Sequence, residues 1–240
     1  GGSGMRPLGN FLAREEPLKA DLFFSHLHWD HIQGFPFFDP AFHRGNRFHI
    51  YAERRLNVTI ESVLQGQMEH PNFPVTLKAM GAEMVFHELD GGDSVHLGPV
   101  VVTTTSLNHP GGCLGIRIQL GDRSLTYATD TEHGGGADEQ LLDLAQGTDV
   151  LIYDTMYTDE EYHGRRGGLS HKGWGHSTWR EGIAVARAAG AGHLMLFHYN
   201  PTHDDEALSA IEAEARRAFP RPTASREGMI VEIASRVTFR

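Results

Sequence analysis

The sequence predicts an α/β fold in which sheets carry helices on their outer faces, and three observations lead to this prediction. Strand-like and helix-like segments alternate along the 240 residues. Gly-Gly, Gly-Pro and Gly-Asp pairs separate several of the strands. About 40% of the residues are apolar, which is enough for a substantial core. No internal repeat or low-complexity tract interrupts the pattern, so residues 1–240 are expected to form a single domain.

The predicted strands are short apolar runs rich in β-branched and aromatic residues. In chain order they cover residues 21–25, 48–51, 83–86, 99–105, 114–120, 124–128, 149–153, 193–197, 229–233 and 237–239. Helical spacing occurs at Leu56, Ile60, Val63 and Leu64. Three further helices are expected at 138–146, 178–189 and 204–219, and the first two are followed by Gly147 and Gly190.

Bulk properties exclude several classes of function. The net charge of −10 disfavours a broad nucleic-acid surface, which is normally basic. No apolar run is as long as the eighteen or so residues of a membrane span, and no visible segment resembles a secretory signal. The single cysteine, Cys113, rules out an internal disulfide and fits a reducing compartment. These properties predict a cytoplasmic protein that contacts neither a membrane nor extended nucleic acid.

Three imidazoles and a carboxylate follow the first predicted strand, in His26-Leu-His28-Trp-Asp30-His31. Burying all four without partners would cost each group its hydration, whereas a metal site would compensate them together. Residues two apart in an extended segment point the same way, so His26 and His28 are expected to share one ion. Asp30 and His31 are expected to bind a second ion. Sixteen histidines in the chain also favour a metal site.

Three other candidate ligands follow predicted strands, namely His109, Asp130 and His198. Loops at strand ends are where α/β proteins place functional polar residues. The full set suits two ions, one bound by His26, His28 and His109 and the other by Asp30, His31 and His198, with Asp130 bridging them. Two ions about 3.5–4 Å apart can share a hydroxide that is nucleophilic at neutral pH. Histidine and carboxylate ligands suit zinc, manganese and iron alike.

The segment 26–31 resembles the HxHxDH signature of the metallo-β-lactamase superfamily, and His109, Asp130 and His198 stand in that superfamily's order. The resemblance extends over nearly the whole chain. It implies a four-layer αββα sandwich with a dinuclear site at one edge of the two sheets.

Three further segments resemble the phosphodiesterase branch that includes ribonuclease Z. They are Leu107-Asn-His-Pro-Gly-Gly-Cys-Leu-Gly-Ile-Arg117, the acidic end of Asp149-Val-Leu-Ile-Tyr-Asp-Thr155, and Gly175-His-Ser-Thr178. In that branch the loop histidine pairs with the acidic residue and assists the leaving group, which implies His176 with Asp154. Asp154 stands where ribonuclease Z has a glutamate, and no lysine-rich arm for transfer RNA is present. A smaller phosphodiester, such as a cyclic nucleotide or cyclic phosphate, therefore fits better.

The beginning of the chain admits two interpretations. Gly1-Gly-Ser-Gly-Met5 is typical of an expression linker. Alternatively, Gly2-Ser-Gly-Met-Arg-Pro-Leu-Gly9 resembles a native turn that follows a strand in one bacterial group of these hydrolases, and this interpretation is preferred. The first sheet would then lack its initial strands in this chain. Its exposed edge would recruit a strand from a partner or from a second copy in a homo-oligomer.

The sequence thus predicts a dinuclear metal-dependent hydrolase of small phosphodiesters, in which a metal-bridging hydroxide attacks phosphorus. His176 is the expected general acid, Asp154 orients it, and Asp30 joins them in the catalytic set. Three alternatives remain open. They are a lactonase or thioesterase on the same fold, an iron-dependent redox member of the superfamily, and an inactive fragment that depends on a partner.

Overall fold

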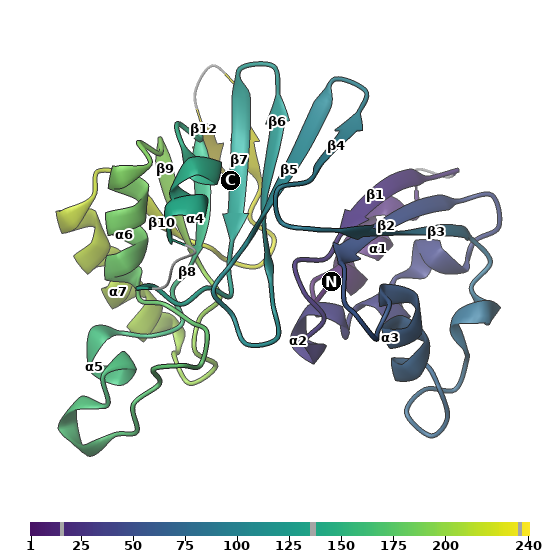
Figure 1. The fold of residues 1–240 in the computed structure, drawn as a ribbon, viewed down its shortest axis with the longest axis horizontal. Coiled ribbons are helices and arrows are strands. Elements are labelled where there is room, and N and C mark those ends of the chain that lie inside the picture. The colour runs from purple at the N-terminus through teal and green to yellow at the C-terminus, as the bar shows by residue number, and fades with distance from the viewer. Residues whose placement is uncertain (15–16, 135–137, 235–236) are drawn as a thin grey trace. The chain divides into compact units, whose positions relative to one another are not determined.

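The computed structural model describes residues 1–14, 17–134, 138–234 and 237–240. The chain forms two compact units, Gly1–Asp90 and Gly91–Arg240, which we call unit 1 and unit 2. Each unit combines a sheet with helices, so the predicted α/β fold class is confirmed (Figure 1). The assignment of the whole chain to a single domain stays a prediction.

Unit 1 contains one parallel sheet of three strands in the order β1-β2-β3. Its strands and helices are α1 (Met5–Leu12), β1 (Lys19–Phe23), α2 (Trp29–Ile32), β2 (Arg47–Glu53), α3 (Ile60–Gln67) and β3 (Glu83–Leu89). A core of phenylalanine, isoleucine, leucine and methionine side chains holds them together, including the fully buried Phe38, Ile50 and Leu64. Helix α3 begins later than Leu56 because Thr59 caps it, and Leu56 is fully exposed.

Residues 1–4 pack against the rest of unit 1. The backbone N–H of Gly34 donates to the carbonyl of Gly1 over 2.9 Å, and the N–H of Met5 donates to the carbonyl of Gly2 over 2.9 Å. A Cβ at Gly34 would lie 1.9 Å from the oxygen of Gly2, so only glycine allows this close approach. The choice between a linker and a native turn stays a prediction.

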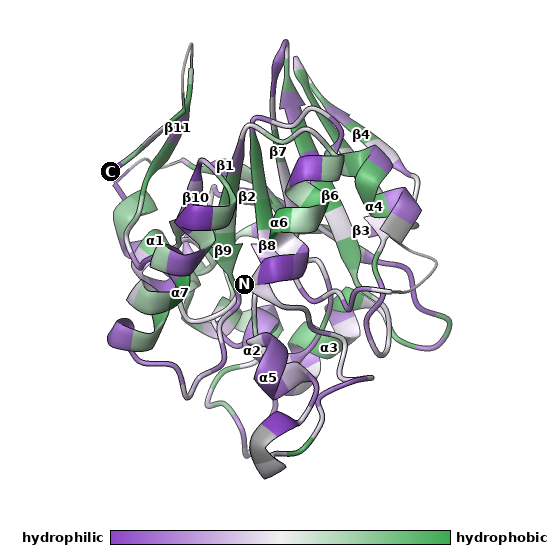
Figure 2. Ribbon diagram, turned by 90° about the vertical axis from the view of Figure 1, so that its left-hand side faces the viewer, coloured by the Kyte–Doolittle hydropathy of each residue, from purple (hydrophilic) through white to green (hydrophobic). Residues whose placement is uncertain are grey.

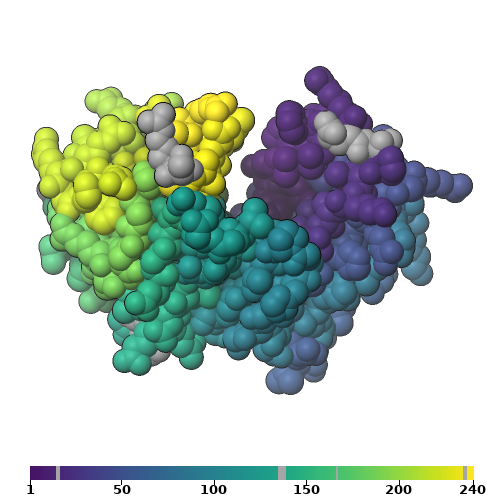
Figure 3. Space-filling view, turned by 90° about the horizontal axis from the view of Figure 1, so that it is seen from above, coloured from purple at the N-terminus to yellow at the C-terminus, as the bar shows by residue number. Residues whose placement is uncertain are grey.

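Unit 2 contains a seven-stranded sheet in the order β10-β9-β8-β7-β6-β5-β4 and a terminal two-stranded sheet. Strands β4 to β7 are antiparallel neighbours, whereas β7, β8, β9 and β10 are parallel. The strands are β4 (Ser94–Leu97), β5 (Val100–Ser106), β6 (Leu114–Leu120), β7 (Arg123–Ala128), β8 (Val150–Asp154), β9 (His193–Phe197), β10 (Pro222–Ala224), β11 (Val231–Ile233) and β12 (Val237–Phe239). The C-terminal residues, yellow in Figure 3, lie at the surface.

Helices α4 (Asp138–Ala145), α6 (Trp179–Ala188) and α7 (Asp205–Ala218) pack against this sheet, while α5 (Asp159–Tyr162) lies in the long connection after β8. The unit 2 core gathers apolar side chains from the central strands and these helices, among them Leu151, Leu194 and Ile183. Figure 2 shows β9 as hydrophobic and α5 as hydrophilic, as expected for a buried strand and for a short helix with three acidic residues. No helix among the described residues is long and apolar enough to cross a membrane.

Candidate metal centre

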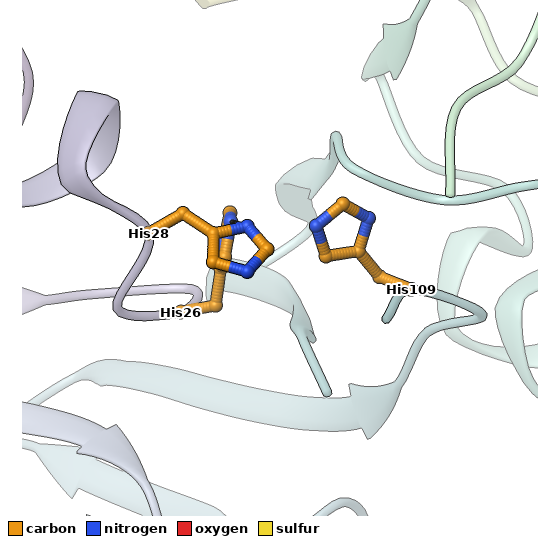
Figure 4. A group of neighbouring side chains, drawn as sticks. All are labelled: His26, His28 and His109. Atoms are coloured by element: carbon orange, nitrogen blue, oxygen red, sulfur yellow. Dashed lines mark hydrogen bonds between the residues drawn. The ribbon is translucent and has the colours of Figure 1, made fainter. Parts of the chain in front are cut away.

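The loop that joins β1 to α2 carries His26 and His28, and α2 itself carries Asp30 and His31. His26 is fully buried, and its Nδ1 lies 3.2 Å from Ser25 Oγ while its Nε2 lies 3.1 Å from His28 Nδ1 (Figure 4). The ring centroid of His31 lies 4.2 Å from that of His26, and His31 Nε2 lies 3.0 Å from Asp30 Oδ2. Unit 1 therefore brings together His26, His28, Asp30 and His31, as the strand-to-turn pattern predicts.

In unit 2 three parallel neighbours, β7, β8 and β9, end at one edge of the sheet. Asp130 follows β7, Asp154 ends β8 and His198 follows β9, so the topology places all three side by side. His198 Nε2 lies 3.3 Å from Asp130 Oδ1. Asp130 and His198 both adopt positive φ angles, 61° and 59°, which cost non-glycine residues about 1–3 kcal/mol and are typical of functional sites.

The carboxylate of Asp154 is buried and accepts several hydrogen bonds. Its Oδ2 accepts from the backbone N–H of Asp130 over 2.9 Å, and its Oδ1 accepts from the N–H groups of Met156 and Ser177 over 3.1 and 2.9 Å. The Nδ1 of His176 lies 2.9 Å from the same Oδ2. Because an ionised carboxylate only accepts, His176 donates from Nδ1 and keeps Nε2 for another partner. The predicted pair of His176 and Asp154 is therefore present as a contact.

His109, also labelled in Figure 4, lies in the loop after β5 and points its Nδ1 at the carbonyl oxygen of Gly175, 2.9 Å away. A carbonyl only accepts, so this contact makes Nδ1 the donor. Metal-binding histidines commonly have such a partner on the second nitrogen. The ring centroid of His109 lies 5.2 Å from that of His176.

Glu132 is a buried carboxylate that the sequence analysis did not select. Its Oε1 accepts from the Gly173 N–H and the Tyr162 hydroxyl, both over 2.7 Å, and its Oε2 accepts from the Gly175 N–H over 2.9 Å. Burial by itself raises the pKa of Glu132, but these hydrogen bonds outweigh it and hold the pKa below 4.5. Glu132 is therefore an anion at neutral pH. The one available signal was its place two residues after Asp130.

The side chains of unit 2 fit a divalent transition metal. One ligand atom from each of Asp130, Asp154, His176 and His198 lies within 4.8 Å of the others, and imidazole with carboxylate is a donor set for zinc, manganese or iron. Both oxygens of Asp154 already accept hydrogen bonds, so Asp130 and His198 are the stronger candidates for direct ligands. His109, whose Nδ1 donates to the Gly175 carbonyl, is a further candidate ligand.

Comparison with known proteins identifies the family. The model of the beta-lactamase superfamily domain matches residues 5–199, most of the chain. The chain belongs to the beta-lactamase superfamily. It is also distantly similar to ribonuclease BN of Salmonella typhi, with 25% identity over 251 residues that cover 83% of this chain and 76% of the relative.

Solved structures of this superfamily show the same fold. The metallo-β-lactamase-fold protein YhfI of Bacillus subtilis covers 100% of this chain with a TM-score of 0.65, 18% identity and 85% of its own length. A diphosphatase of the PhnP family covers 94% of this chain and 76% of its own length, with a TM-score of 0.63 and 20% identity. The short form of human tRNase Z covers 89% and 79%, with a TM-score of 0.63 and 18% identity. The α/β metallo-β-lactamase fold is thereby established.

Proposed function

We propose that this superfamily member hydrolyses small phosphodiesters, such as a cyclic nucleotide or cyclic phosphate. The observation that carries the proposal is the His176–Asp154 pair, joined over 2.9 Å beside the candidate ligands Asp130 and His198. An imidazole with one nitrogen fixed by a buried carboxylate is suited to donate a proton from the other nitrogen. Breaking a P–O bond to an alkoxide requires such a donor, because an alkoxide is a poor leaving group.

The proposed centre would hold two ions through seven side chains. His26, His28 and His109 would hold one ion, Asp30, His31 and His198 the other, and Asp130 both, within the αββα sandwich of the superfamily. When bound, two divalent ions lower the pKa of a water molecule and offset negative charge on phosphoryl oxygens. The identity of the metal as zinc, manganese or iron is part of the proposal, as is the catalytic role of Asp30.

His176 and Asp154 would carry out the proton transfer to the leaving group. His176, protonated at both nitrogens, would place its Nε2–H toward the leaving oxygen while Nδ1–H remains bonded to Asp154. As a hydroxide attacks phosphorus and the P–O bond breaks, the proton moves from Nε2 to the departing oxygen, which leaves as an alcohol. Asp154 stabilises the imidazolium before the transfer and fixes the ring afterwards, and its bonds from Asp130, Met156 and Ser177 keep the carboxylate in place.

Partners and location are also proposals. The substrate would be a small anion, with no membrane or extended nucleic acid involved, in a cytoplasmic protein. In the described part of unit 1, β1 pairs with β2 alone, so its outer edge is suited to accept a strand from a partner or a second copy.

The test compares two substrates in His176→Ala. A ribose alkoxide needs a proton to leave, whereas p-nitrophenolate does not, so turnover of 2′,3′-cyclic AMP should fall about 10²–10⁴-fold. Hydrolysis of bis(p-nitrophenyl) phosphate should fall much less. His163→Ala is the matched control, because its exposed imidazole contacts the Asp159 carbonyl and the Tyr162 ring at the end of α5 and is not a candidate ligand. It should leave both rates unchanged.

Equal losses on both substrates would show that His176 positions the substrate or supports the metal site. Activity on lactones or thioesters, with none on either phosphodiester, would replace the proposal with the carbon-ester alternative.

A further inference from the structure

We propose that Glu132 is a positioning residue, which holds His109 and His176 in the orientations that the metal centre and the proton transfer require. The inference rests on the proposed function. It assigns a role to Glu132, which lies outside the HxHxDH signature at residues 26–31. It is carried by hydrogen bonds within unit 2 alone.

Glu132 fixes the loop that leads into His176. Its carboxylate accepts the N–H groups of Gly173 and Gly175, which lie two residues apart and both have φ of +83°. That alternating backbone turns two N–H groups toward one anion, as in the anion-binding concavities known as nests. An amide side chain has one acceptor oxygen and an NH₂ donor, so it cannot accept from both glycines in this arrangement.

Gly175 transmits this constraint to His109. Its N–H is held by Glu132 over 2.9 Å, and its carbonyl accepts from His109 Nδ1, also over 2.9 Å. The orientation and tautomer of the His109 ring therefore depend on where Glu132 holds the backbone of Gly175. Orienting partners of this kind typically change metal affinity or activity 10–100-fold when they are removed.

The backbone of Glu132 is also hydrogen-bonded to Asn108, in the loop that carries His109. The Glu132 N–H donates to the carbonyl of Asn108, and the Asn108 side-chain amide donates to the carbonyl of Glu132, over 2.8 and 2.9 Å. Asn108 immediately precedes His109, Glu132 follows Asp130 by two residues, and Gly175 immediately precedes His176. Glu132 thus joins the three loops that carry these candidate site residues.

The decisive variant is Glu132→Gln, which preserves shape and removes one acceptor. Tyr162→Phe is its matched control, because it removes one hydrogen bond from the same carboxylate and leaves both glycine bonds intact. Zn²⁺ affinity of the full chain would be measured by competition with a chromophoric chelator, beside thermal unfolding of the metal-free protein. We expect Glu132→Gln to raise the dissociation constant about 10–100-fold, and Tyr162→Phe to change it less than about threefold.

Wild-type Zn²⁺ affinity in Glu132→Gln would overturn the inference, as would an equal loss in Tyr162→Phe. A lower melting temperature with unchanged affinity would show a purely structural role and would also overturn it. If Glu132→Gln does not fold, Glu132→Asp, which keeps two acceptor oxygens on a shorter side chain, is measured instead, and wild-type affinity there would contradict the proposal. Failure of the wild-type chain to bind Zn²⁺, Mn²⁺ or Fe²⁺ would instead refute the proposed function.

Discussion

Gly175 is a position at which both the backbone and a neighbouring ring require glycine. Its φ is +83°, and a Cβ there would lie 2.3 Å from His109 Nδ1 and 2.3 Å from Pro110 Cδ. Such approaches are far shorter than van der Waals contact, so the loop or the imidazole would have to move. The geometry of the site therefore depends on the lack of a side chain at Gly175 as well as on the polar side chains.

Gly175→Ala should displace His109 and lower metal affinity by at least about tenfold. Gly173→Ala is the control, because Gly173 has the same φ of +83° but no atom within 4 Å of its hypothetical Cβ. Both variants carry the strain of a positive φ, and only Gly175→Ala adds the clash. Isothermal titration with Zn²⁺ measures the difference, and equal affinities in the two variants would argue against the clash.

The residues of the site divide sharply into those that sequence reasoning predicts and those that it misses. His26, His28, His109 and their companions follow strands in a recognisable order, and a resemblance pairs His176 with Asp154. Only its place two residues after Asp130 marks Glu132 locally, because its partners Gly173 and Gly175 lie 41 and 43 residues away. The bond from the Asp130 N–H to Asp154 likewise joins two separate strand ends, so it becomes visible only when the sheet order is known.

At the scale of elements, α5 depends on a capping box. Thr158 Oγ1 accepts from the Glu161 N–H, and Glu161 Oε2 accepts from the Thr158 N–H over 2.7 Å. His203 Nε2 also lies 2.8 Å from Glu161 Oε1. Burial by itself raises the pKa of Glu161, but the bonds from Thr158 and His203 outweigh it and hold the pKa below 4.5.

The depressed pKa of Glu161 gives a pH dependence with a defined sign. The folded state favours the ionised form, so the stabilisation is complete above pH 4.5, the pKa of the unfolded state, and is lost as pH falls through the lower folded pKa. Glu161→Gln should cost on the order of 1 kcal/mol at pH 7, as for a lost helix cap, and progressively less below pH 4.5. Urea unfolding measured from pH 7 to below pH 4.5 tests this pH dependence of the cost of Glu161→Gln. Glu206→Gln, in the first turn of α7, is the control. A cost that does not depend on pH would contradict the assignment.

Most strands and long helices agree with the sequence prediction to within a few residues, because their apolar periodicity is strong. The expected helix at 204–219, for example, is α7 at Asp205–Ala218. Short elements were missed, among them α2 and α5 with four residues each and β10 with three. Isolated segments of this length are not stable, so tertiary contacts determine them as well as local sequence.

At the scale of the whole molecule, the candidate ligands are divided between the two units. Unit 1 contains His26 and His28 in the loop after β1 and Asp30 and His31 in α2, and unit 2 contains His109, Asp130 and His198 in three loops. In the proposed function these side chains would hold the metal ions. Binding of metal to the folded chain would then stabilise it, by about 2.7 kcal/mol at a free metal concentration one hundred times the dissociation constant.

Elemental analysis of the purified full chain, before and after reconstitution with Zn²⁺, Mn²⁺ or Fe²⁺, tests the central claim most directly. The account predicts about two equivalents of one transition metal per chain, as in two-metal hydrolase sites. Asp30→Ala should retain the ion assigned to His26, His28 and His109 and lose much of the other. The matched variant Asp39→Ala, whose exposed carboxylate pairs with His43, should retain both. A wild-type chain that holds no transition metal after reconstitution would contradict the account.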